Sequence, residues 1–456
     1  MLCQPAALAH PQSELHAARL DLERNVAPVE RATTRYVSFY PLVANRRAAA
    51  RDVLSFVLNS VSRATVLIRP EVVPGSEGSL LRVSLARYGL PAEEWERLAS
   101  RDPYWHLRTE VLDPTASVGG KRATRAVFTD GGWLDLDEAR TLRELSHSSG
   151  ALLRGDFFLR QATTTLDGGA YYRLAGIAQT EAEFLRTIGI DSAVVDRLQA
   201  DEGANLLYSL VTFKLRRIVR RAGPLGGVWQ TYDVNASTAE RDPFRNPFAF
   251  TYDAGEYIVA KKNGLHLFAL FDANGQRQDT VPDVIAKDAS EPRGPGIVVP
   301  MISCVRCHVE DGLRPFVNDQ QRLLSSHVAL VSDDPRVVER LAAFYDTNLG
   351  KRLLRDREDY AAAVGACTEG RTPAEIAALL AEFIAEYADR PVTIEQAARE
   401  LGLSVEQLQR ALRVSHDPAL LALVAGLAIQ RQQWEASFAE AALLAAPLVS
   451  SSQPKE

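Results

Sequence analysis

The chain has 456 residues, of which 46% are hydrophobic and 24% charged, and its formal net charge is -6. This length indicates more than one domain, and the composition excludes a disordered or fibrous protein. The negative charge argues against nucleic-acid binding, which needs a basic surface to neutralise phosphates. No window approaches eighteen consecutive apolar residues, so the sequence predicts no transmembrane segment.

The first half of the chain predicts helices around a small sheet. Apolar residues recur at helical spacing between residues 45 and 63, and two β-type runs at 64–73 and 80–90 flank a turn-rich segment, which predicts a strand pair. Pro91 begins a short helix with acidic residues in its first turn. Most segments between Trp133 and Phe213 are typical of helices, including one that starts with a capping box at Thr180.

The periodicity changes near Phe244. Two apolar runs, 256–262 and 265–271, flank Asn263-Gly264, which is the strongest short signal of a β-hairpin, and a second turn follows at Asn274-Gly275. We predict an antiparallel β-meander at about residues 247–281. Its run 265–271 is apolar on both faces and should be buried on both sides.

The segment MISCVRCH, residues 301–308, contains the Cys-x-x-Cys-His pattern that attaches c-type haem. Two thiols three residues apart can reach the two vinyl groups on one edge of the porphyrin, and the next residue places an imidazole under the iron. We therefore expect one covalent haem c, bound through Cys304 and Cys307, with His308 as the proximal ligand of the iron. Because the meander directly precedes the motif, we expect the haem to lie against the run 265–271.

Two other sites also use Cys-x-x-Cys: half of a zinc site and a thioredoxin-like redox pair. The fifteen residues after the motif supply no further Cys or His for zinc, and a redox pair has no need of His308. Of the four cysteines, the other two, Cys3 and Cys367, lie far from the motif in sequence. The cysteines therefore mark a site and do not form a disulfide scaffold.

The second axial ligand of the iron is less well defined. No methionine follows the motif, and Met301 lies too close before it, so a His/Met pair is not expected. The position could be empty, or it could be taken by His327, His266, His147, His106 or His416. We favour His327 as a possible distal ligand, because the nineteen residues after His308 give the chain enough length to reach the opposite haem face.

After residue 319 the chain is almost entirely helical in pattern, with capping-box starts at Thr372, Thr393 and Ser404. The predicted fold class is α+β, mainly helical, with an antiparallel β-meander before the haem loop and an all-helical C-terminal domain. We expect three regions. They are a mixed, mainly helical region at 1–240, the meander and haem-binding segment at 241–325, and a helical domain at 326–450.

Several blocks outside the motif resemble a family of uncharacterised, exported bacterial cytochrome c-domain-containing proteins. They include RYVSFYPL, LLRVSLARYGLPAEEWERLASRDPYW, NPFAFTYDAGEYIVAKKNGLHLFALFDANGQRQD, PMISCVRCHVEDGLRPF and ALVAGLAIQRQQWEASF. Together they extend from about Arg35 to Phe438. The resemblance implies one haem, with Cys304, Cys307 and His308 as its protein ligands, and it implies no substrate.

The expected location follows from the cofactor. The N-terminal residues MLCQPAALAHPQ have no basic region and no evident leader, although Ala7-Leu8-Ala9 resembles the end of a cleavage site. Because c-type haem is normally attached outside the cytoplasm, we expect a periplasmic or exported protein.

Three hypotheses of function are compatible with these patterns. The first is electron transfer to or from a redox partner protein or a small-molecule electron donor or acceptor. The second is a peroxidase-like haem enzyme or sensor with an open distal position, so whether the chain is an enzyme stays open. The third is DNA binding through residues 397–416, which follow a helix-turn-helix pattern. Arg410 and Arg413 share that second helix with Glu406 in an acidic chain, so we expect no nucleic-acid partner.

Overall fold

The computed structural model describes residues 11–105, 117–118, 121–122, 136–191, 200–209, 214–234, 238–281, 297–320, 332–345 and 348–450. The chain divides into two compact units. The first consists of Met1–Leu54, Pro70–Arg160 and Glu382–Glu456, and the second of Ser55–Arg69 and Gln161–Ala381. The three regions expected from the sequence are each continuous, whereas both units join segments that are far apart in the chain.

The first unit contains a four-stranded sheet in the order β2-β3-β1-β6. Its strands are β1 (Thr34–Ser38), β2 (Glu71–Val72), β3 (Leu80–Ser84) and β6 (Leu152–Arg154). Strands β2 and β3 are the predicted antiparallel pair, while β6 lies parallel to β1. A separate ribbon is formed by β4 (Ser117–Val118) and β5 (Lys121–Arg122).

The helices of the first unit come from both ends of the chain. They are α1 (Pro11–Arg24), the 3-10 helix η1 (Pro28–Thr33), α3 (Leu85–Tyr88), α4 (Ala92–Ala99), α5 (Leu136–Ser146), the π-helix η3 (Ala385–Asp389), α14 (Ile394–Leu401), α15 (Val405–Leu412), α16 (Pro418–Val424) and α17 (Arg431–Ser450). The chain passes from one unit to the other within α2 (Ala44–Val61), α6 (Gly155–Ala162) and α13 (Pro373–Ile384). The predicted helix at 45–63 is therefore confirmed as α2.

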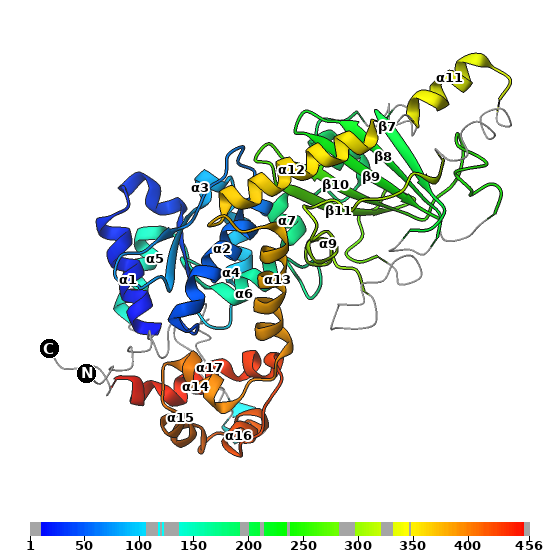
Figure 1. Cartoon of the computed structure of the whole chain (residues 1–456). Coiled ribbons are helices and arrows are strands. Elements are labelled where there is room, and N and C mark those ends of the chain that lie inside the picture. Colours follow the sequence, from blue (N-terminus) through cyan, green and yellow to red (C-terminus); the bar gives the residue numbers. More distant parts are fainter. Residues whose placement is uncertain are drawn as a thin grey trace, which may run out of the picture. The chain divides into compact units, whose positions relative to one another are not determined.

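The second unit is built on a five-stranded antiparallel sheet in the order β11-β10-β9-β8-β7 (Figure 1). Its strands are β7 (Glu202–Leu206), β8 (Arg216–Ala222), β9 (Gly227–Asp233), β10 (Ala254–Ala260) and β11 (His266–Asp272). The predicted meander is confirmed as β10 and β11, joined at Asn263-Gly264. The sheet is larger than predicted, because β7, β8 and β9 precede it in residues that the sequence did not predict as strands.

Helices cover both faces of this sheet. They are α7 (Tyr171–Ala175), α8 (Glu181–Thr187), α9 (Ile302–Cys307), α11 (Pro335–Phe344) and α12 (Leu349–Cys367). Leu349 and Leu353 of α12 pack with Trp229 on one face, and Figure 1 shows this helix lying along the sheet. Phe344 of α11 packs with Tyr232 on the other face.

The fold class is α+β, as predicted, with an antiparallel sheet before the motif and a helical C-terminal region. The capping-box prediction is confirmed at Ser404, where the side chain of Ser404 and that of Gln407 satisfy each other's backbone N–H groups. Within the described ranges, no helix combines the length and the apolar character that crossing a bilayer requires.

The residues of the helix-turn-helix pattern form α14 and α15, joined at Gly402, whose φ of 68° is left-handed. Leu408 and Leu412 of α15 are buried, whereas Glu406 and Arg410 are both exposed. The exposed surface of α15 therefore mixes both signs of charge.

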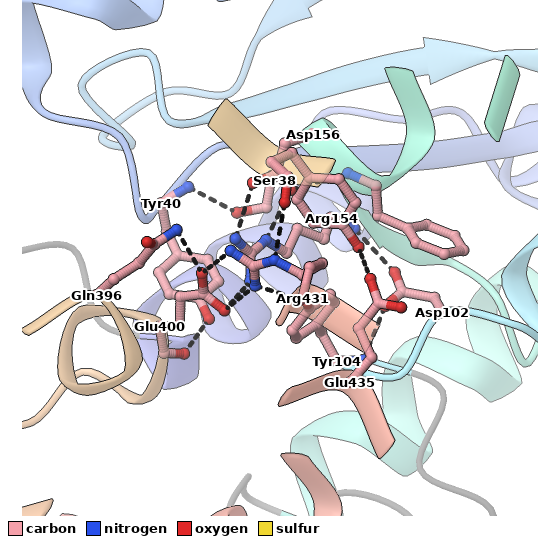
Figure 2. Close-up of polar contacts among 12 residues, drawn as sticks. Ser38, Tyr40, Asp102, Tyr104, Arg154, Asp156, Gln396, Glu400, Arg431 and Glu435 are labelled. Atoms are coloured by element: carbon pink, nitrogen blue, oxygen red, sulfur yellow. Dashed lines mark hydrogen bonds and ion pairs between the residues drawn. The ribbon is translucent and has the colours of Figure 1, made fainter. Parts of the chain in front are cut away.

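A buried ion network joins the segments of the first unit (Figure 2). The carboxylate of Glu400 in α14 accepts hydrogen bonds from Arg154 Nη1 at 2.6 Å, from Arg431 Nη1 and Nη2 at 2.9 Å each, and from Trp434 Nε1 at 2.7 Å. Arg154 also pairs with Asp156. Burial opposes ionisation of Glu400, but the two arginines outweigh it and hold the pKa of Glu400 below its ordinary value. One carboxylate thus connects β6, α14 and α17.

We expect Glu400→Gln to destabilise the first unit by about 3–5 kcal/mol, because it leaves two buried guanidinium groups without their shared counter-charge. Urea unfolding followed by tryptophan fluorescence, together with hydrogen exchange of the α14 and α17 amides, measures this loss. Glu406→Gln on the exposed surface of α15 is the matched control and should change little.

The same pair of variants has a pH signature. A carboxyl whose folded pKa lies below its unfolded value stabilises the fold above the unfolded value of about 4.3, and this stabilisation declines as the pH falls. The difference in unfolding free energy between wild type and Glu400→Gln should therefore be largest near pH 7 and shrink below about pH 4. Equal stability of the two proteins at pH 7 would refute a stabilising role for the network.

Candidate functional site

The motif forms a helix of one and a half turns. Cys304 and Cys307 lie in α9, three residues apart and therefore on one helix face, and both are half-buried. His308 follows directly; its N–H donates to Cys304 O at 2.8 Å, and its carbonyl accepts from Gly312 N at 3.0 Å. The three predicted site residues thus lie on consecutive turns of one short segment.

The backbone on each side of α9 is strained. Met301, buried just before the helix, has φ 71° and ψ −70°, and Asp311, just after the motif, has φ 58°. Left-handed or rarer conformations at residues other than glycine cost on the order of 1–3 kcal/mol and concentrate at functional sites. They persist here because tertiary contacts hold them: Ile302 N–H donates to Thr163 O at 3.2 Å, and Arg357 lies 3.1 Å from Asp311.

His308 lines a pocket of about 340 Å³ over the sheet, called here the His308 pocket. Its volume lies within the range of roughly 300–1,000 Å³ that is typical of small-molecule sites. Its apolar wall consists of Leu206, Ile218, Trp229, Ile258, Leu313, Phe316 and Leu353. The rings of Trp229 and Phe316 meet edge to face, with centroids 6.3 Å apart. Large apolar groups also remain open to solvent at its lining, since Tyr208 is 58% and Val317 57% exposed.

The surroundings of His308 favour the neutral form of its imidazole. Burial, reinforced by the positive charges of Arg216 and Arg314, lowers the pKa of His308 to about 4. Its Nδ1 is buried and has no hydrogen-bond partner in the described part of the chain. A neutral imidazole carries a lone pair, which is the form that binds a metal.

Two arginines line the same pocket in different states. Arg216 on β8 is buried and already paired, with Nε 2.5 Å from Asp233 Oδ1 and Nη2 3.3 Å from Glu256 Oε2. Arg314 is exposed and has no ion-pair partner among the residues that the structure describes. Of the two arginines, Arg314 is therefore the one that could meet an anionic group, as far as the described residues show.

The edge of the sheet beside α9 is closed by two tyrosines of α7. Tyr171 accepts a hydrogen bond from Phe268 N at 2.8 Å and donates one to Phe268 O at 3.1 Å, while Tyr172 accepts one from Leu270 N at 3.3 Å. Cys304 lies close enough to raise the pKa of both tyrosines, although burial is the larger cause. Strand β11 is therefore buried on both faces, as predicted, even though it is an edge strand.

The motif and the meander lie in the same unit, on one sheet. Phe268 is paired with Ile258, and Leu270 with Glu256, so both belong to the sheet face that carries the His308 pocket. The two thiols do not line that pocket; only His308 of the motif does. A haem lying against 265–271 stays a prediction.

The candidate histidines are dispersed. His327 and His106 lie outside the described residues, and His147 and His416 belong to the first unit. His266 is buried near His308, stacked on Tyr360 with ring centroids 4.2 Å apart. A Cβ on Gly312 would come within 2.8 Å of its ring, so His266 lies under the turn that follows the motif. Burial, with a contribution from His308, lowers the pKa of His266 to about 3.

The structure also bears on the two other interpretations of the motif, a zinc site and a thioredoxin-like redox pair. Within the described ranges, no group of three or more His, Cys, Asp or Glu side chains is placed to hold a metal ion. A thioredoxin-like pair belongs to a βαβ unit, whereas the strands before α9 are antiparallel.

Comparison with protein-family models, with curated proteins and with solved structures gives no match to this chain. The residues and geometry of the site therefore carry the functional interpretation.

Sequence reasoning identified the motif but missed the pocket wall. Arg216 and Ile218 come from β8, whose sequence RRIVRRA is so rich in arginine that it does not resemble a strand. Trp229 and Thr231 come from β9, which is rich in β-branched and aromatic residues, and this composition is a strand signal that could have been found.

We expect Tyr171→Phe to loosen the sheet edge next to Cys304, because it removes the partner of both backbone groups of Phe268. An unsatisfied buried group costs about 1–3 kcal/mol, so exchange of the Phe268 amide should accelerate. The backbone N–H groups of the alternate residues Leu267 and Ala269 face β10 and not Tyr171. Their amide exchange rates should therefore change little, and they serve as internal controls. Uniform acceleration along β11, or none, would contradict this role.

Proposed function

We propose that this chain is a c-type haem protein that transfers electrons through one covalently attached haem. The observation that carries the proposal is the placement of the motif: Cys304 and Cys307 share a helix face, and His308, held neutral, lines an apolar pocket of about 340 Å³. We also propose that the chain belongs to the exported cytochrome c-domain family that its sequence resembles, and that it acts in the periplasm or outside the cell.

The residues present fit such a group. Cys304 and Cys307 are half-buried and not in a disulfide, the imidazole has a buried nitrogen without a hydrogen-bond partner among the described residues, and the pocket combines aromatic walls with an exposed arginine. Exposed Tyr208 and Val317 provide apolar surface that a porphyrin would cover. Arg314 could meet a carboxylate of the haem edge, since it has no other ion-pair partner among the described residues.

A bound c-type haem supplies one-electron redox chemistry at its iron. Cys304 and Cys307 would hold the group through their sulfur atoms, and His308 would supply a nitrogen ligand to its iron. Trp229 and Phe316 would cover the group on its apolar side, and limiting the access of water is one of the means by which proteins set a reduction potential. The electron donor or acceptor is a partner protein or a small molecule.

Protein made in a host with c-type haem maturation should carry one haem that survives acid-acetone extraction, because thioether bonds are not broken by it. The double variant Cys304→Ala with Cys307→Ala should lose this covalent haem. Intact-protein mass spectrometry and the optical spectrum of the extracted protein measure the difference.

The matched control is Cys367→Ala, which removes a buried cysteine outside the motif and should leave attachment unchanged. If the wild-type mass lacks one haem in a maturation-competent host, the proposal fails.

For the second axial position we propose a histidine, with His327 as the ligand. Ferric wild-type protein should then be low-spin by electron paramagnetic resonance, and His327→Ala should convert it to a high-spin form that binds carbon monoxide when reduced. His416→Ala, which removes a histidine of the first unit, is the control.

Two results would redirect this assignment. A low-spin signal that survives His327→Ala excludes that residue, and loss of the signal in His266→Ala would assign the ligand to the meander. A wild-type protein that is already high-spin and binds carbon monoxide or cyanide would favour a peroxidase-like enzyme or sensor with an open distal position.

A further inference from the structure

A second and larger hollow lies in the same unit, with a volume of about 880 Å³. It is bounded by the turn between β8 and β9, by the turn between β10 and β11, and by the part of α12 from Lys351 to Ala366. We call it the basic hollow. Its size again suits a small molecule, and none of its lining residues is part of the His308 pocket.

The hollow is strongly cationic within an acidic chain. Its charged residues are the cations Arg220, Lys261, Lys262, Lys351, Arg352 and Arg355 and the carboxylates Asp356 and Asp359. Six basic side chains against two carboxylates contrast with the net charge of -6 for the whole chain. A concave surface lined by one sign of charge concentrates ligands of the opposite sign.

Some of these cations are already neutralised. Arg220 holds Asp356 through two hydrogen bonds, of 2.9 and 3.2 Å, and Arg352 Nε lies 3.1 Å from Glu202. Lys262, Lys351 and Arg355 are exposed and have no ion-pair partner in the part of the chain that the structure describes. Three cations without an ion-pair partner among the described residues therefore surround the hollow, together with the carboxylate of Asp359.

These three cations are placed to act together. Lys351 and Arg355 are four residues apart on α12 and so lie on the same helix face. Lys262 belongs to the turn between β10 and β11, on a different wall. The turn can approach α12 because it contains Gly264, at φ 86°, where a Cβ would lie 2.7 Å from Ala363 Cβ.

Lys261 adds a fourth cation without a carboxylate. Its ammonium group donates to Asn59 O at 2.6 Å and to Ser60 O at 2.8 Å, near the end of α2. A lysine has three N–H donors, so two carbonyl partners leave one donor unused. Burial lowers the pKa of Lys261 to about 7, which means that an anion in the hollow would favour its charged form.

We propose that the basic hollow binds a small multivalent anion, one that carries at least two phosphate or carboxylate groups. Several cations on two walls match several anionic groups on one ligand better than they match a single monovalent ion. The limited size of the hollow, about 880 Å³, favours a small molecule over a nucleic acid, which would require an extended basic face.

Calorimetric titration of the full-length protein tests this proposal at about 50 mM salt, where charge pairing is only partly screened. Inorganic pyrophosphate and citrate are the two probes, since they separate a phosphate preference from a carboxylate preference. Binding of either supports the proposal, and it should weaken when the salt is raised to about 300 mM.

The triple variant Lys262→Ala, Lys351→Ala and Arg355→Ala should weaken binding by at least about tenfold, since charge-assisted contacts are the strong ones. All three side chains are exposed, so the fold should persist. The matched control removes three exposed arginines of the first unit, Arg399→Ala, Arg410→Ala and Arg413→Ala, and should bind within about twofold of wild type.

Failure to bind either anion at millimolar concentration overturns the proposal, as does a triple variant that binds like the wild type. Neither outcome depends on haem attachment, so this inference and the proposed function can fail independently.

Discussion

The second unit depends on one constraint. Strand β8 carries four buried arginines, and each guanidinium group needs a hydrogen-bond or ion-pair partner inside the protein. A buried charge without a partner costs several kcal/mol, and the surrounding elements supply the partners. On the face of the His308 pocket, Arg216 is held by Asp233 of β9 and Glu256 of β10, while Arg220 is held by Asp356 of α12.

On the opposite face of the sheet, Arg217 donates a hydrogen bond of 2.6 Å to the hydroxyl of Tyr345, which directly follows α11. Arg221 donates to Gln230 at 2.6 Å. One strand thereby fixes a helix on each side of the sheet.

The haem-type motif uses this sheet as its support. Its helix α9 begins at a strained, buried Met301 and ends in a turn that packs on His266, so its path is dictated by contacts with residues from distant parts of the sequence. The adjoining edge strand is closed by Tyr171 and Tyr172, which occupy hydrogen-bonding groups that would otherwise attract another strand. The motif is therefore a segment of unusual backbone geometry beside a strand whose outer hydrogen-bonding groups are satisfied.

Helix α12 forms one wall of the His308 pocket and one wall of the basic hollow, and it presents an apolar residue to the first and charged residues to the second. Leu353 lines the apolar His308 pocket, whereas Lys351 and Arg355 line the basic hollow. Trp229 links the two: it belongs to the His308 pocket and donates its Nε1–H to Asp356 Oδ2 of the basic hollow at 2.8 Å. Helix α12 thus lies between an apolar pocket and a basic hollow, and the residues that line each are only a few positions apart in its sequence.

The sequence by itself determined the features that are encoded locally. The Cys304, Cys307 and His308 spacing, the hairpin at Asn263-Gly264 and the capped helices such as α15 are written in neighbouring residues, and all three have the local form expected of them. Tertiary structure decided what depends on distant partners. Arginines are unusual in a buried strand. Strand β8 nevertheless forms, because residues of other elements, such as Asp233 and Tyr345, provide partners for its guanidinium groups. The pocket beside His308, and the pairing of the first unit's ends around Glu400, arise from long-range packing that no local pattern specifies.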